Sequence, residues 1–85
     1  MPYIKQSDRV GIDSRTRLPQ TAGELNYAIT RLILTYADQP SNGPFNYQKI
    51  NDIIGALEGA KQEFYRRRVG PYEDKKIIEN GDVYE

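Results

Sequence analysis

Hydrophobic positions follow a helical period through two long stretches of the chain. In the first stretch, apolar side chains recur every three or four residues between residues 25 and 36, as on one face of an α-helix. Thr21 and Glu24 precede this stretch in a capping-box pattern, in which the two side chains satisfy free backbone amides at a helix start. Pro40 follows, and proline cannot continue a helix. The pattern predicts a helix over about residues 22–38.

The second stretch has a narrower apolar face, which runs from Ile50 to Phe64 at spacings of three and four residues. Asn46 is a favourable N-cap residue in front of it. The Gly70-Pro71 pair behind it is a helix stop signal. We therefore expect a helix over about residues 46–68.

Two glycines, Gly55 and Gly59, lie inside this second predicted helix. Each costs about 1 kcal/mol relative to alanine in a helix interior. Close approach of another backbone would compensate for this cost, and the alternative is that both glycines face solvent.

The C-terminal region predicts a short third helix over about residues 71–80. Pro71 suits the first helical position, where its missing N–H costs nothing, and the Asn80-Gly81 pair is a C-terminal stop of the left-handed type. Residues 1–20 show no sustained period, and we interpret them as an irregular, extended arm.

These elements predict an all-α fold in a single domain over residues 1–85, with an arm over 1–20 and a helical body over 21–85. We expect the two long helices to pack antiparallel as a helical hairpin, with the short helix folded back on their ends. The helix over residues 22–38 carries more apolar surface than one neighbour covers. We therefore expect a homo-oligomer that associates through this helix.

Composition excludes several kinds of chemistry. The chain has no cysteine and no histidine, which removes disulfides, typical zinc sites and the usual neutral-pH general base. It also lacks the glycine-rich phosphate-binding motifs. We therefore expect a protein that is not an enzyme and that holds no metal and no cofactor.

Charge and hydropathy narrow the range of partners. Lys plus Arg and Asp plus Glu number 12 each, so no overall field attracts nucleic acid, and general nucleic-acid binding is not expected. The longest apolar run is far shorter than the ~20 residues of a membrane span, and the N-terminal residues lack the apolar core of a signal peptide. These features are typical of a cytoplasmic protein that does not bind membranes.

Arginine and tyrosine side chains gather where the second and third predicted helices meet. Arg66, Arg67 and Arg68 are consecutive, and Tyr65 and Tyr72 flank them. Guanidinium groups beside aromatic rings suit an anionic ligand with a base that stacks. The alternative is an internal salt bridge, for which the available carboxylates are those of Glu63, Glu73 and Asp74.

Four motifs carry a resemblance to a known family: GELNY, EFYRR, PYEDKKI and ENGDVY, at residues 23–27, 63–67, 71–77 and 79–84. With them, nearly the whole chain resembles a family of small bacteriophage and prophage proteins of unknown function. The resemblance implies a phage origin and hence the cytoplasm of an infected bacterial host. The shared positions are largely polar, which is typical of a ligand site or a specific interface.

The predicted site residues fall into two groups. The candidates for ligand binding are Tyr65, Arg66, Arg67, Tyr72, Asn26 and Arg31. The candidates for a structural or interface role are Glu24, Tyr27, Glu63, Pro71, Glu73, Asp74, Asn80, Gly81, Asp82 and Tyr84.

Two functions are compatible with these observations. The first is a non-enzymatic phage accessory protein that binds or sequesters a small anionic ligand, such as a nucleotide that signals host defence. The alternative is a helical interaction module that docks on a host or phage protein.

Overall fold

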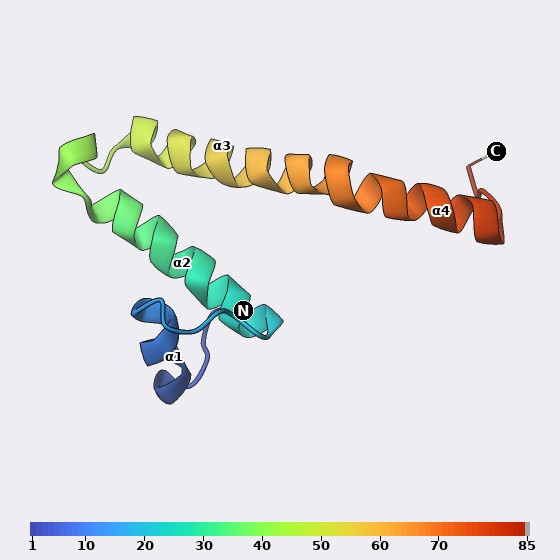
Figure 1. Ribbon diagram of the computed structural model, residues 1–85. Coiled ribbons are helices and arrows are strands. Elements are labelled where there is room, and N and C mark those ends of the chain that lie inside the picture. The colour runs from blue at the N-terminus through green and yellow to red at the C-terminus, as the bar shows by residue number, and fades with distance from the viewer. Residues whose placement is uncertain (85) are drawn as a thin grey trace. The chain divides into compact units, whose positions relative to one another are not determined.

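The computed structural model describes residues 1–84, and every regular element among them is helical (Figure 1). The α-helices are α1 (Gln6–Asp13), α2 (Ala22–Asp38), α3 (Tyr47–Phe64) and α4 (Gly70–Asn80). A 3-10 turn, η1 (Pro40–Asn42), follows α2, and a π-helical segment, η2 (Tyr65–Val69), follows α3. The all-α prediction is confirmed. Glu85, the last residue of the predicted helical body, lies outside the described residues.

Both long helices begin at the predicted capping residues. The Glu24 backbone N–H donates to Thr21 Oγ1 over 3.1 Å at the start of α2. The Lys49 backbone N–H donates to Asn46 Oδ1 over 3.0 Å at the start of α3. These bonds satisfy amides that have no partner within the helix. The helix predicted over residues 22–38 is confirmed at both ends.

Lys49 connects the end of α2 to the start of α3. Its side chain is buried, with 4% of the residue exposed. The ammonium group donates to the backbone carbonyls of Ala37, Gln39 and Gly43. The Ala37 carbonyl lies in the last turn of α2, where the helix dipole favours a cation. Lys49 thus takes the place of a C-terminal cap and also holds the loop through η1.

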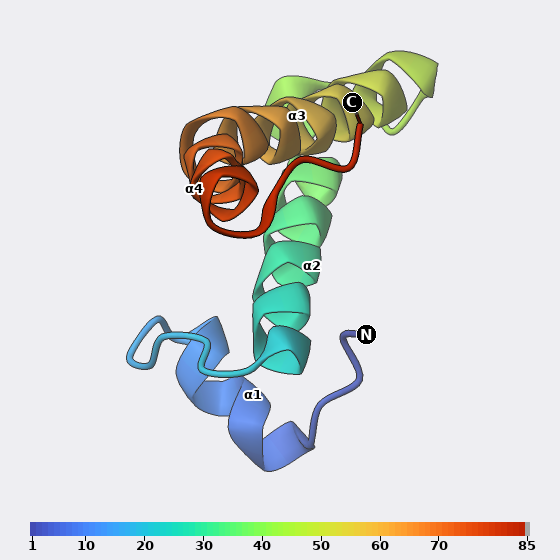
Figure 2. The same cartoon turned by 90° about the vertical axis from the view of Figure 1, so that its right-hand side faces the viewer.

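The prediction of an extended arm over residues 1–20 is wrong for Gln6–Asp13, which form α1. An isolated helix of this length is marginal in water, and tertiary packing usually stabilises it. Ile12 is the buried residue of α1, and Figure 2 shows α1 beside the N-terminal part of α2. The helix therefore depends on a contact that the local sequence period does not reveal.

The predicted stop at Gly70-Pro71 is also wrong, because α3, η2 and α4 follow one another without a loop. Proline inside an α-helix clashes with the carbonyl four residues earlier. Here the Gly70 N–H bonds to the Tyr65 carbonyl, five residues earlier. This wider π turn changes the backbone path just before Pro71. As a result, α4, the predicted short third helix, continues the line of α3 and does not fold back on it.

At its other end, α4 stops where the sequence predicts. Gly81 caps it with a φ of 90° and a ψ of 145°, and its N–H donates to the Ile77 carbonyl over 2.8 Å. The positive φ is a conformation that glycine adopts at little cost.

The chain divides into two compact units, Met1–Lys49 and a second unit that begins at Ile50, within the first turns of α3. The first unit has a small core that contains Ile12, Tyr27 and Ala37. In the second unit, no residue between positions 50 and 84 is buried. The single-domain and antiparallel-hairpin predictions stay predictions.

Gly55 and Gly59 both lie in the second unit. Apart from the neighbouring backbone of the same helix, a Cβ atom added to either one would meet no described atom within 4 Å. Within this chain, both glycines therefore face open space, as in the second alternative for this pair.

We expect Lys49→Met to lower the free energy of unfolding by about 3 kcal/mol or more, because a hydrogen bond from a charged donor contributes about 1.5–3 kcal/mol and the variant loses all three bonds. Methionine keeps most of the apolar stem of lysine and removes only the donor. Lys61→Met is the matched control on the same helix, because the Lys61 side chain is 73% exposed. Urea denaturation of both variants measures the difference, and equal midpoints would contradict the role of Lys49.

Candidate functional site

The loop between α1 and α2 folds back on α1 through a compact turn. The backbone N–H groups of Thr16 and Arg17 both donate to the Gly11 carbonyl, over 2.9 and 3.2 Å. Arg15, between them and α1, has a φ of 60°, a left-handed conformation that is uncommon for residues other than glycine. A Cβ atom at Gly11 would lie 3.0 Å from the Arg17 Cβ atom. The absence of a side chain at Gly11 therefore permits the close return of the loop.

The carboxylate of Glu24 attaches this loop to α2. Glu24 is 6% exposed. One of its oxygens accepts from Arg17 Nη2 over 2.8 Å, and the other accepts from the Gln20 backbone N–H over 3.0 Å. The bond from Arg17, supported by the Gln20 amide, lowers the pKa of Glu24 below its ordinary value. The Gln20 bond is a variant of the predicted capping box, which pairs the carboxylate with the amide of the N-cap residue itself.

A second polar contact joins α1 to the middle of α2. The Tyr27 hydroxyl lies 2.8 Å from each oxygen of the Asp13 carboxylate. Burial raises the pKa of the Tyr27 hydroxyl, and its hydrogen bond to Asp13 acts in the same direction. Arg31 Nε lies 3.6 Å from the same carboxylate, and the Arg9 guanidinium lies 5.4 Å from the centre of the Tyr27 ring. The Asp13 carboxylate therefore contacts a neutral donor, the Tyr27 hydroxyl, and a cation, the Arg31 guanidinium.

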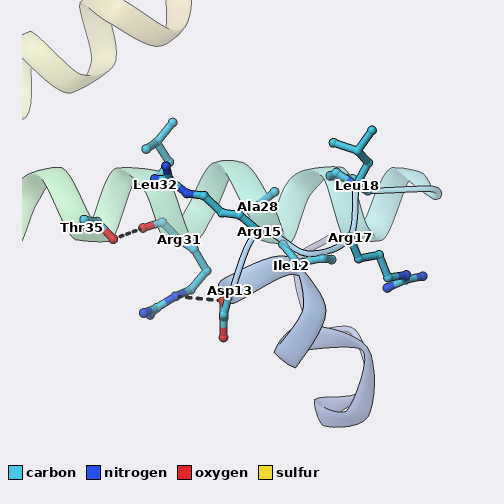
Figure 3. A pocket seen from close by; sticks show the side chains of 10 residues that line it. Ile12, Asp13, Arg15, Arg17, Leu18, Ala28, Arg31, Leu32 and Thr35 are labelled. Carbon is cyan, nitrogen blue, oxygen red and sulfur yellow. Dashed lines mark hydrogen bonds and ion pairs between the residues drawn. The ribbon is translucent and has the colours of Figure 1, made fainter.

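These contacts border a groove of about 550 Å³ on the first unit, which we call the arginine groove. Its lining residues are Ile12, Asp13, Arg15, Arg17, Leu18, Pro19, Ala28, Arg31, Leu32 and Thr35. Figure 3 shows the Arg15 side chain stretched along α2 toward Leu32, whereas Arg31 points to Asp13. Three guanidinium groups and one carboxylate thus lie around a partly apolar hollow.

Arg15 differs from the other two arginines of the groove. Arg17 is bound to Glu24 and also donates to the Asp8 carbonyl over 3.4 Å. Arg31 is paired with Asp13. Within residues 1–84, the Arg15 side chain has no ion pair and no hydrogen bond. Its guanidinium is therefore available to a ligand.

The predicted ligand-binding residues belong to both units of the chain. Arg31 lines the arginine groove, and Asn26, one turn earlier on α2, contacts the Thr30 hydroxyl through its side-chain and backbone oxygens. Tyr65 and Tyr72 belong to the second unit. The hydrogen bond to Glu73 raises the pKa of the Tyr65 hydroxyl.

Arg66 and Arg67 both pair with one carboxylate oxygen of Glu63, at 2.7 and 2.6 Å. The bond from Arg67, followed by that from Arg66, lowers the pKa of Glu63. All of these side chains are more than half exposed, and exposed ion pairs contribute only about 0–1 kcal/mol. Arg66 and Arg67 therefore form an internal salt bridge with Glu63, one of the three carboxylates expected for that alternative.

A second hollow, of about 560 Å³, lies on the second unit along α4 and the residues that follow it. It brings together most of the residues predicted for a structural or interface role. Its lining is Gly70, Tyr72, Glu73, Asp74, Lys76, Ile77, Asn80, Gly81, Asp82, Val83 and Tyr84. Three carboxylates outnumber the single cation, Lys76, which lies 5.6 Å from the centre of the Tyr72 ring. This acidic hollow is unsuited to an anionic ligand.

Four of the residues predicted for a structural or interface role lie outside this hollow: Pro71, Glu24, Tyr27 and Glu63. Pro71 is in the first turn of α4. Glu24 and Tyr27 are buried in the first unit, and Glu63 pairs with the two arginines at the end of α3.

Among residues 1–84, no three acidic side chains come together as possible ligands of a metal ion. In the same part of the chain, the helices lack any segment with the length and hydropathy of a membrane span.

A family model described as "Domain of unknown function (DUF6899)" matches residues 1–83. The chain belongs to this family. Searches among curated proteins and among solved structures found no match. Membership of DUF6899 agrees with the resemblance to a family of unknown function.

Most of the arginine groove of this DUF6899 chain was missed by sequence reasoning. Of the predicted residues, only Arg31 lines it. A signal was present in the local charge, because residues 9–17 contain three arginines and one acid. Nothing in the local pattern shows that Arg15 and Arg31 share a groove, since that depends on the loop returning to α2.

We expect Glu24→Gln to destabilise the protein at pH 7. Glutamine keeps an acceptor for the Gln20 amide but loses the charge that holds Arg17. Because folding lowers the pKa of Glu24 from its ordinary 4.5, its contribution is present above pH 4.5 and is lost as the pH falls below that value. The stability gap between wild type and variant should therefore narrow in acid.

Urea midpoints at pH 7 and pH 3 measure this gap. Glu63→Gln is the control, because the pKa of Glu63 is also lowered but its side chain is 54% exposed, and we expect only a small change. A gap for Glu24→Gln that is absent at pH 7, or unchanged at pH 3, would contradict the role of the carboxylate.

Proposed function

We propose that this protein is a non-enzymatic phage accessory protein that binds a small organic anion in the arginine groove, with a nucleotide as the ligand class. The observation that carries the proposal is the Arg15 guanidinium, which has no partner among the described residues and lines the same groove as Leu32. Binding in the cytoplasm of an infected host would sequester the ligand, for example a nucleotide that signals host defence.

The size and the chemistry of the groove support a ligand of this class. Its volume of about 550 Å³ lies within the range of about 300–1,000 Å³ that is typical of small-molecule sites. A guanidinium presents a planar fork of donors that matches the two oxygens of a phosphate or carboxylate. Leu18, Ala28 and Leu32 offer apolar surface to the rest of the ligand.

The same lining favours binding over catalysis. Asp13 is the acidic group of the groove, and it is already engaged by Tyr27 and Arg31. Thr35 is its only hydroxyl among the described lining residues, and that hydroxyl donates to the Arg31 carbonyl over 2.8 Å. A nucleophile paired with a free general base is therefore not part of this arrangement.

We expect wild-type protein to bind adenosine nucleotides in isothermal titration calorimetry, and Arg15→Ala to weaken the binding about tenfold or more, because a hydrogen bond to a charged group contributes about 1.5–3 kcal/mol. Arg68→Ala is the matched control: it removes the same charge from an exposed position outside the groove. Equal binding by both variants would place the site elsewhere, and absence of nucleotide binding by the wild type would overturn the proposal.

A second candidate function is protein association, and the apolar face of α3 favours it. Along this face, Ile50, Ile54, Leu57 and Phe64 recur at spacings of three, four or seven residues and are 37–60% exposed. Exposed apolar stripes of this kind are typical of helix–helix interfaces. We propose that a second copy of the chain covers this face. Association through α2, as expected from its surplus apolar surface, remains part of this candidate.

Leu57→Glu tests this association, because a carboxylate in an apolar interface is costly to desolvate. We expect the wild type to be an oligomer by size-exclusion chromatography with light scattering, and Leu57→Glu to be of lower mass. Gln62→Glu, at an exposed position away from the stripe, should keep the wild-type mass. A monomeric wild type that captures a host or phage protein in equal amounts would support docking on that protein in place of self-association.

A further inference from the structure

The arginine groove has a small net charge despite its three arginines. Asp13 faces the groove, and Glu24 pairs with Arg17 at its border. Three guanidinium groups against two carboxylates leave one net positive charge. A ligand with several negative charges would therefore carry more negative charge than the groove can neutralise.

The excess positive charge is located on Arg15. Arg17 is tied to the buried Glu24 carboxylate at 2.8 Å, and its own side chain is only 32% exposed. Arg31 is balanced by Asp13 at 3.6 Å. Arg15 alone among the three has no partner within the described part of the chain, and its side chain lies along the groove (Figure 3).

Asp13 is held at the groove by its own contacts. Both of its oxygens lie 2.8 Å from the Tyr27 hydroxyl, and Tyr27 is only 8% exposed. Because this contact fixes α1 against α2, the carboxylate cannot leave when a ligand arrives without loss of the bond to Tyr27. A second negative charge on the ligand would face this carboxylate at short range.

We infer that the groove selects an organic anion with a single negative charge spread over two oxygens, as in a phosphodiester or a carboxylate, and discriminates against phosphomonoesters and polyphosphates. The inference rests on the proposed function and specifies its ligand class. Two oxygens match the donor fork of one guanidinium, and one charge matches the net charge of the groove.

A series of adenosine compounds tests this inference, because the nucleoside stays the same while the charge changes. Adenosine 3′,5′-cyclic monophosphate and adenosine 5′-carboxylic acid each carry one negative charge. Adenosine 5′-monophosphate carries about two at pH 7.5, because the second pKa of a phosphate monoester is about 6, and ATP carries more. Isothermal titration calorimetry is done without divalent cations and at low ionic strength, where screening is weak.

We expect the two singly charged compounds to bind wild-type protein more tightly than the monophosphate, and ATP to bind most weakly. The stronger of the two singly charged compounds identifies the phosphodiester or the carboxylate as the preferred group. Tighter binding of the monophosphate or of ATP would overturn the charge selection and leave the proposed anion site intact. If none of the four compounds binds, the proposed function fails, and this inference fails with it.

Asp13→Asn provides a second test, because asparagine keeps an oxygen acceptor for Tyr27 and removes the repelling charge. We expect the affinity for the monophosphate, relative to the cyclic nucleotide, to rise about tenfold, as for the loss of one nearby charge in a partly solvated site. Asp38→Asn makes the same change of charge at an exposed position outside the groove, and its ratio should equal that of the wild type. An unchanged ratio in Asp13→Asn would overturn the inference.

Discussion

Glu24 occupies the first turn of α2 with both carboxylate oxygens engaged, one by Arg17 and the other by the Gln20 amide. A buried carboxylate is tolerated only when partners replace its lost hydration. Here the partners come from the segment that leads into the helix, so the bonds that satisfy Glu24 also hold that segment against α2. The loop, the return of α1 and the position of Arg15 all depend on this arrangement.

The contacts on α2 also explain why a unit with so few buried apolar residues has a defined structure. Its core contains only Ile12, Tyr27 and Ala37 among the buried hydrophobic residues. Polar contacts supplement it at three points along α2: Glu24 at the start, Tyr27 with Asp13 in the middle, and Lys49 at the end. No buried side-chain nitrogen or oxygen atom of the described residues lacks a hydrogen-bond partner. Directional bonds therefore position the groove more than apolar packing does.

The second unit differs from the first because none of its described residues is buried. Its helices are continuous through the π turn at Tyr65–Val69, and most of its large apolar side chains are exposed. A lone amphipathic helix gains little from propensity alone and is normally stabilised by burial of its apolar face. The proposed association through the apolar face of α3 would supply this burial. The π turn accommodates Pro71 within the helical run, and Arg66 and Arg67 lie beside Glu63, outside the two hollows described above.

The sequence by itself determined the all-α class, the bounds of α2, the N-cap residues Thr21 and Asn46, and the stop at Gly81, because these features depend on residues close together in the chain. It also predicted an anion site with arginine side chains, and the arginine run that it proposed for this site contained Arg66 and Arg67. Only the tertiary structure decided that α1 is helical, that the chain continues through Pro71, and that Arg15 and Arg31 share one groove. The physical reason is that each of these features depends on a contact or backbone adjustment whose free energy is absent from any local pattern: Ile12 against α2, the π turn before Pro71, and Glu24 holding the loop.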